Sequence, residues 1–219
     1  MYADKRNFRA YSRNKIKSKM IDVKEFYNEL AKNDISFFCG VPDSLLKSFC
    51  AYVSANTPNE RYIITANEGA AISLASGYYI GTGKLSLVYM QNSGIGNAVN
   101  PLMSLADPDV YSIQLILLIG WRGEPGIKDE PQHFKQGKVT LDLLQAMKIS
   151  IEIIDKNSNI EDVINNAVSY CNINKSPFAI VARKDTFTEY KLDKSNSDLN
   201  LTREAALEIV LENISPRSI

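Results

Sequence analysis

Apolar residues occur along this chain in two alternating patterns. Short continuous apolar runs are typical of strands covered on both faces, and between them apolar residues recur at helical spacing. The first helical stretch opens with Asp22 three residues before Glu25, which resembles a capping box. The expected strands are residues 36–39, 62–65, 85–90, 113–119, 149–154 and 178–181, and the expected helices are residues 22–33, 44–53, 68–80, 93–105, 140–147 and 160–171. This alternation predicts an α/β fold with a doubly wound, parallel, six-stranded sheet.

Composition narrows the class of protein. The chain has 219 residues, of which 45% are hydrophobic, so it is long enough to bury a large core. The longest apolar run, residues 115–120, is far shorter than the about 20 residues that a membrane-spanning helix needs. Three cysteines without a Cys-x-x-Cys spacing and a single histidine favour neither a disulfide framework nor a zinc cluster. We therefore expect a cytoplasmic protein that neither enters a membrane nor binds a metal ion itself.

Charge is distributed unevenly. The 25 basic and 25 acidic residues cancel, so no overall field favours nucleic acid. Residues 1–20 nevertheless hold seven basic side chains and one acid. A nucleic-acid tail or a targeting peptide is an alternative, but we expect a disordered basic extension. Residues 21–183 then form the main domain, and the polar stretch from residue 184 is a linker that leads to a helix at residues 201–211, the start of a following segment.

Candidate chemistry lies in the turns that follow the strands. In open α/β sheets ligands bind beyond the carboxyl ends of the strands. Four such turns carry polar or glycine residues, and these are residues 40–44, 66–69, 91–97 and 120–137. Glu68 begins a helix rich in Gly, Ala and Ser, which permits close approach of a flat ligand or another subunit, although a carboxylate there also simply complements the helix dipole. His133 lies in the long fourth loop, where it is either an acid–base group or ordinary surface.

Four motifs in order resemble the thiamine-diphosphate-dependent 2-oxoacid decarboxylases. They are Gly-Val-Pro-Asp-Ser at 40–44, Asn-Glu-Gly-Ala-Ala at 67–71, Gln-Asn-Ser-Gly-Ile-Gly-Asn at 91–97, and Gly-Trp-Arg-Gly-Glu-Pro-Gly at 120–126 with Pro-Gln-His at 131–133. Within the family, the similarity is greatest to enzymes that act on 3-phosphonopyruvate and next to the alpha chains of those that act on sulfopyruvate. The resemblance implies the thiamine diphosphate-binding fold, as its pyrimidine domain, over about residues 22–182.

The resemblance also implies roles for individual residues. Glu68 matches the glutamate that hydrogen-bonds N1′ of the cofactor's aminopyrimidine. Asp43 and His133 match acid–base groups near the reacting carbon, with Ser44 as the competing candidate because the register is open by one residue. The side chains that would line the cofactor side of the cleft are Gln91, Asn92 and Asn97. Arg122 or Lys128 would offset the anionic group of the substrate, together with Ser44.

One departure from the family pattern affects the expected partners. The family holds the diphosphate and Mg²⁺ with a Gly-Asp-Gly segment followed later by Asn-Asn on a second domain, and the chain contains no Gly-Asp-Gly. The resemblance therefore implies that another chain, or the remainder of a longer protein, supplies that half and that the enzyme is a homo-oligomer or a complex. The alternative is a noncatalytic interaction domain that dimerises through its small-residue helices.

Overall fold

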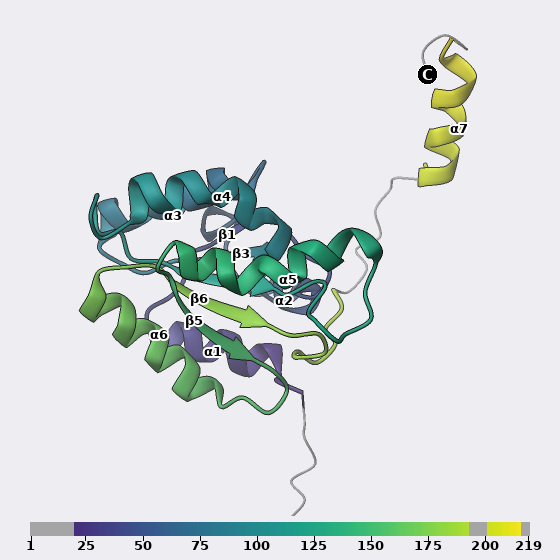
Figure 1. The fold of residues 1–219 in the computed structure, drawn as a ribbon. Coiled ribbons are helices and arrows are strands. Elements are labelled where there is room, and N and C mark those ends of the chain that lie inside the picture. Colours follow the sequence, from purple (N-terminus) through teal and green to yellow (C-terminus); the bar gives the residue numbers. More distant parts are fainter. Residues whose placement is uncertain (1–19, 193–200, 216–219) are drawn as a thin grey trace, which may run out of the picture.

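The computed structural model describes residues 20–192 and 201–215. Its body is a six-stranded sheet in the order β2-β1-β3-β4-β6-β5 with helices on both faces (Figure 1). Every strand pairing is parallel, so the predicted fold class is confirmed. The elements are α1 (Val23–Lys32), β1 (Phe38–Gly40), α2 (Lys47–Asn56), η1 (Asn59–Arg61), β2 (Tyr62–Ile64), α3 (Glu68–Thr82), β3 (Leu87–Gln91), η2 (Asn92–Gly94), α4 (Ile95–Pro101), η3 (Leu102–Ala106), β4 (Ile116–Gly120), α5 (Pro131–Ala146), β5 (Ser150–Ile154), α6 (Ile160–Asn174), β6 (Phe178–Ala182) and α7 (Arg203–Asn213).

The two faces of the sheet bury separate apolar cores. Residues of α1, α2 and α6 pack on one face, and residues of α3, α4 and α5 pack on the other. All five residues of β4 are buried, as its continuous apolar run predicts for a strand covered on both faces. The three cysteines are free and buried, and burial raises the pKa of each thiol to about 12.

The strand order places a topological switch point between β1 and β3. These strands are neighbours, with Gly40 opposite Tyr89, but the helices that follow them lie on opposite faces of the sheet. Chains that leave adjacent strands toward opposite faces open a crevice at the carboxyl edge, which is where such folds bind ligands. The turns after β1, β2, β3 and β4 all reach this edge.

Three helices differ from the expected bounds. The first turn of the predicted helix at 44–53 is a non-helical turn, and α2 begins at Lys47. The predicted helix at 93–105 is divided into η2, α4 and the π-helical η3, with Pro101 at the junction of the last two. The helix predicted from residue 140 begins at Pro131, so His133 lies in its first turn and not in a loop. Proline is favoured at the first helical position, and this signal at Pro131 was missed.

The segment that follows β6 packs against the body. Ile21 and Phe187 form a parallel bridge, and the Phe187 ring contacts Phe26 and Phe49 in the core. The boundary at residue 183 stays a prediction, and the basic extension at residues 1–20 lies almost wholly outside the described residues. Within the described ranges, no helix has the length and apolar character to cross a membrane.

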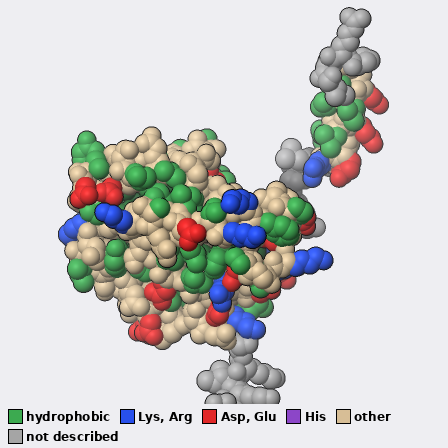
Figure 2. Space-filling model, viewed as in Figure 1, with side chains coloured by type: hydrophobic (Ala, Val, Ile, Leu, Met, Phe, Trp, Pro, Cys, Tyr) green, Lys and Arg blue, Asp and Glu red, His purple; other side chains and the backbone are tan. Residues whose placement is uncertain are grey.

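Helix α7 buries none of its residues and lies apart from the body in Figure 1. Figure 2 shows acidic and hydrophobic side chains side by side on this helix. Its exposed apolar residues include Leu207, Val210 and Leu211.

Candidate active site at the carboxyl ends of the strands

Glu68 is a buried carboxylate at the first position of α3. It is 8% exposed, and Asn67 caps the helix by accepting a hydrogen bond from the backbone N–H of Ala70 at 2.9 Å. The Nδ2 of Asn97 on α4 donates to Glu68 Oε2 at 2.8 Å. The structure thus joins Glu68 to Asn97, while the role of both residues toward a cofactor stays a prediction. The positive end of the α3 dipole also stabilises the carboxylate.

Two glycines allow the surroundings of Glu68 to pack closely. A Cβ atom on Gly94 would overlap the Glu68 carboxylate. A Cβ on Gly69 would lie 2.7 Å from the backbone oxygen of Asn97, so this small residue lets α3 approach α4. Part of the small-residue pattern in α3 thus serves packing inside the chain, whereas nothing lies within 4 Å of a Cβ at Gly77 on the outer surface.

Asp43 is a second buried carboxylate, in the turn between β1 and α2. It is 5% exposed; its Oδ2 accepts from the backbone N–H of Leu45 at 3.0 Å, while its buried Oδ1 has no hydrogen-bond partner among the described residues. A Cβ on Gly120, at the end of β4, would overlap Oδ2, so the carboxylate lies directly on that glycine. Burial raises the pKa of Asp43 above its ordinary value, and the Leu45 hydrogen bond and the charge of Arg122 oppose this rise.

Ser44 differs from Asp43 in its environment. It is exposed, and its Oγ accepts a hydrogen bond from Arg122 Nη1 at 2.7 Å. The structure thus brings together the predicted residues Ser44 and Arg122. Asp43 is buried whereas Ser44 faces the solvent, so the two side chains can play different roles.

Arg122 is held by Asp129, a residue that the sequence analysis did not single out. The Nε of Arg122 donates to Asp129 Oδ2 at 2.9 Å, and Nη2 donates to the other oxygen. The backbone N–H groups of Gly123 and Glu130 also donate to this carboxylate, at 2.7 and 2.8 Å. The hydrogen bonds and charge of Arg122 hold the pKa of Asp129 well below its usual range. The only signal in the sequence is an acid seven positions after an arginine in a loop rich in charge and turn residues.

Asn92 ties this loop to the end of β3. Its fully buried side chain accepts from the backbone N–H of Arg122 at 3.1 Å and donates to Thr140 Oγ1 at 2.8 Å. It also donates to the Arg122 carbonyl at 2.8 Å, so both ends of the amide are engaged by protein atoms. The neighbouring Gln91 donates to Ser93 Oγ at 2.7 Å. Contact of Asn92 and Gln91 with a cofactor stays a prediction.

In the described part of the chain, His133 and Lys128 make no side-chain hydrogen bond or ion pair with the two buried carboxylates, although Lys128 lines a small pocket together with Arg122. His133 is half-buried, and its backbone carbonyl lies against Gly123; Lys128 is exposed. Within residues 20–192, no hydrogen bond or ion pair joins either side chain to Glu68 or Asp43. The described residues also contain no group of three or more His, Cys, Asp or Glu side chains that could hold a metal ion.

Comparison with known protein families identifies the family of this chain. Residues 23–146, more than half of the chain, match the N-terminal TPP binding domain of thiamine pyrophosphate enzymes. The chain belongs to this family. Thiamine pyrophosphate, or thiamine diphosphate, is therefore its cofactor class.

Relatives of this thiamine pyrophosphate enzyme domain include two kinds of decarboxylase. The chain is 37% identical over 135 residues to phosphonopyruvate decarboxylase of Streptomyces viridochromogenes, which covers 62% of this chain and 33% of that protein. It is 32% identical over 124 residues to sulfopyruvate decarboxylase subunit alpha of Methanocaldococcus jannaschii, which covers 56% of this chain and 70% of that subunit. The chain thus spans about a third of the phosphonopyruvate decarboxylases that it matches.

Solved structures share the fold of this domain. Benzoylformate decarboxylase from Polynucleobacter necessarius aligns with a TM-score of 0.59 at 16% identity, over 84% of this chain and 33% of that one. The thiamine diphosphate-dependent 4-hydroxybenzoylformate decarboxylase of Rhodococcus jostii RHA1 aligns with a TM-score of 0.52 at 19% identity, over 88% of this chain and 37% of that one. At these identities the likeness concerns the fold alone.

The described residues fit the aminopyrimidine of this cofactor. Glu68 offers a buried carboxylate in the turn after β2, beside Gly94, whose missing Cβ leaves room for that carboxylate. Asp43 offers a buried oxygen without a protein partner, and such atoms are usually satisfied by a ligand or by water.

Proposed function

We propose that this chain is the pyrimidine-binding half of a thiamine-diphosphate-dependent carboxy-lyase that converts 3-phosphonopyruvate to phosphonoacetaldehyde and CO₂. The observation that carries the proposal is the buried Glu68 carboxylate in the turn after β2, packed on Gly94 and hydrogen-bonded to Asn97. The substrate follows the relatives named phosphonopyruvate decarboxylase, at 37% and 39% identity.

The bound cofactor supplies the nucleophilic carbon and the electron sink for decarboxylation. Glu68 orients the aminopyrimidine by accepting a hydrogen bond from its N1′ atom, and Asn97 fixes the carboxylate for this contact. Gln91 and Asn92 line the cofactor side of the cleft in this proposal. Asn92 does so through the turn after β3, which its side-chain hydrogen bonds hold in place.

Asp43 and His133 are the proposed acid–base groups of the reaction. Burial raises the pKa of Asp43, so its carboxyl group holds a proton at higher pH than an exposed aspartate does. Its partnerless Oδ1 is the atom that exchanges this proton. Ser44 and Arg122 form the polar margin beside it, where they receive the substrate together with Lys128.

The diphosphate and Mg²⁺ belong, in this proposal, to a second domain with a Gly-Asp-Gly segment. That domain comes from another subunit of a homo-oligomer or from a partner chain. The chain is inactive without it.

The second candidate function is that of a sulfopyruvate decarboxylase alpha chain. The observation in its favour is the similarity to sulfopyruvate decarboxylase subunit alpha of Methanocaldococcus jannaschii, at 32% identity over 124 residues. Separate subunits would also provide the diphosphate-binding half on another chain.

The test is decarboxylation by this chain assembled with a Gly-Asp-Gly-bearing diphosphate domain, thiamine diphosphate and Mg²⁺. We expect phosphonopyruvate to react faster than sulfopyruvate and pyruvate. Preference for sulfopyruvate would support the second candidate. No turnover of any of the three by the assembled complex would refute the decarboxylase proposal and favour a noncatalytic interaction domain.

Glu68→Gln tests the residue that carries the proposal. We expect a loss of at least about 100-fold in turnover with an unchanged circular dichroism spectrum, because an interaction made with the reacting cofactor is removed while the fold is kept. Glu25→Gln is the matched control, since Glu25 is also an acid in the first turn of a helix but is exposed on α1. Equal activity of the two variants would assign Glu68 to helix stabilisation only.

A further inference from the structure

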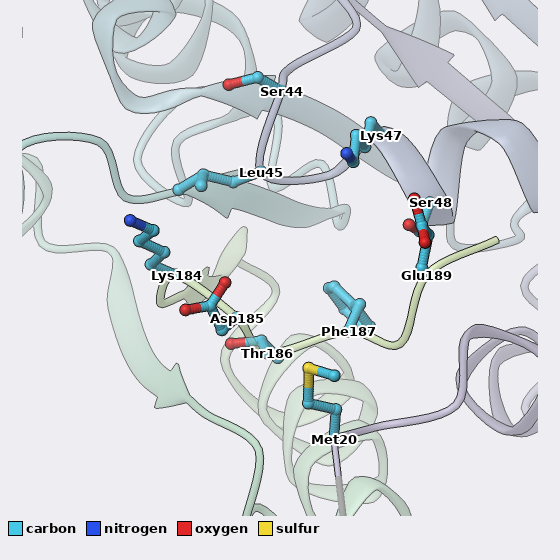
Figure 3. A pocket seen from close by; sticks show the side chains of 10 residues that line it. All are labelled: Met20, Ser44, Leu45, Lys47, Ser48, Lys184, Asp185, Thr186, Phe187 and Glu189. Atoms are coloured by element: carbon cyan, nitrogen blue, oxygen red, sulfur yellow. The ribbon is translucent and has the colours of Figure 1, made fainter. Parts of the chain in front are cut away.

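A small pocket lies beside Arg122. It is enclosed by the loop after β4 and by Lys184, which follows β6. It has a volume of about 80 Å³, and Arg122, Lys128 and Lys184 are among the residues that line it. Strands β4 and β6 pair with Gly120 opposite Ala182, which brings these two segments to the same edge of the sheet. A larger open pocket of about 290 Å³ adjoins it and shares Leu45 and Lys184. Figure 3 shows the Lys184 side chain extending toward Leu45 on this shared wall.

The charges in the small pocket are unequally compensated. Its two acids are already paired: Asp129 with Arg122, and Glu124 with Arg183 at 2.9 Å. Arg122 is in turn committed to Asp129 and to Ser44. Within residues 20–192 and 201–215, no acidic side chain lies within ion-pair distance of Lys128 or Lys184. The pocket therefore carries two ammonium groups that no acid among the described residues neutralises through an ion pair, which favours an anion.

The size and position of the pocket restrict the anion. A volume of about 80 Å³ is several times the about 10–15 Å³ that one water needs, so the pocket has room for a small tetrahedral group. Leu45 forms part of the wall, and its backbone N–H donates to the buried Asp43. The pocket and this carboxylate thus belong to the same turn, so an anion held there is adjacent to the proposed acid–base group.

We propose that Lys128 and Lys184 bind the tetrahedral oxyanion group of the substrate. Arg122, whose guanidinium is engaged by Asp129 and Ser44, borders this site and holds its wall in place. Lys184 has not been singled out by the motifs. A phosphonate, like a phosphate monoester, approaches two negative charges near neutral pH, whereas a sulfonate has one. Two uncompensated ammonium groups match the phosphonate better. This inference rests on the proposed function for its substrate, but the anion site can be tested without the reaction.

The experiment measures binding of methylphosphonate, methanesulfonate and acetate to the complete chain by isothermal titration calorimetry, without cofactor or partner. We expect saturable binding of methylphosphonate, at least threefold weaker binding in Lys128→Met and in Lys184→Met, and at least tenfold weaker binding in the double variant. Methionine keeps a flexible apolar stem of similar length and removes only the charge. Lys138→Met on α5, exposed and without an ion pair in the described residues, is the control and should bind as the unaltered chain does.

Absence of saturable methylphosphonate binding, or equal binding by the double variant, would overturn the site. Equal affinity for methanesulfonate would overturn the charge-based preference for phosphonate. Because no turnover is involved, these results are distinguishable from failure of the decarboxylase proposal. In the assembled enzyme, an unchanged KM for phosphonopyruvate in the double variant would likewise overturn the inference while the proposed function stands.

Discussion

Gly94→Ala probes how Glu68 is held, because the two residues touch. A Cβ at this position would overlap the Cγ, Cδ and Oε1 atoms of Glu68. The backbone of Gly94, with φ −71° and ψ −14°, suits alanine without strain. The whole effect of the substitution therefore falls on the carboxylate, which has to leave its buried position and its hydrogen bond from Asn97.

The expected loss in the free energy of unfolding follows from these contacts. Overpacking a close-packed site costs about 1–3 kcal/mol. Loss of the Asn97 hydrogen bond adds about 1 kcal/mol. Replacing glycine returns about 0.4–1 kcal/mol through the unfolded chain. The net loss is thus about 1–3.6 kcal/mol.

Gly96→Ala is the matched control, two residues away on α4. Nothing lies within 4 Å of a Cβ there, so we expect a gain of about 0.4–1 kcal/mol. Urea unfolding followed by circular dichroism compares the two variants at one pH. If Gly94→Ala proves as stable as Gly96→Ala, the Glu68 carboxylate does not lie on Gly94 and the geometry described for the site is wrong.

Two further predictions concern Asp129 and Asp43, whose substitutions should change the free energy of unfolding in opposite directions at pH 7. Asp129→Asn should lower the free energy of unfolding at pH 7 by about 1–3 kcal/mol, since it weakens hydrogen bonds to a charged partner. Because the pKa of Asp129 is lowered in the folded state, its contribution to the free energy of unfolding is complete above the ordinary aspartate pKa and is lost as pH falls. Urea unfolding of the variant and the unaltered chain at pH 6 and pH 3 should therefore show a smaller deficit at pH 3. A deficit that stays constant would contradict this. Asp43→Asn should instead be stabilising by up to about 1 kcal/mol at pH 7, because the raised pKa of Asp43 means that the folded protein loses stability as pH rises through it. The same titration should show this gain disappearing in acid, and a gain that grows in acid would refute it.

The sheet was predictable because its signal is local. A strand that needs cover on both faces requires consecutive apolar residues, and the run at residues 115–119 supplies them; β4 is accordingly central, between β3 and β6. Helix α1 was predictable for a similar reason, since Asp22 caps it by accepting from the backbone N–H of Lys24 at 2.8 Å. The order of the strands depends on contacts between distant segments, and no local pattern specifies it.

The candidate site was predictable in its residues more than in its contacts. The motifs indicated Glu68 and Asn97 at two different strand ends, and the fold joins them. By contrast, the role of Asp129 arises from a loop conformation in which four donor groups converge on one carboxylate. The burial of Asp43 likewise depends on Gly120, which is 77 positions later in the chain. Such contacts become visible only once the tertiary structure is known.

The bridge between Ile21 and Phe187 has a consequence for how this body combines with other domains. The backbone N–H of Ile21 donates to the Thr186 carbonyl at 2.9 Å, and the N–H of Thr188 donates to the Ile21 carbonyl at 2.8 Å. The points where the chain enters and leaves the body therefore lie next to each other, and this arrangement favours insertion and fusion of domains. A domain fused before Ile21 or after Thr188 would therefore start from the same side of the body.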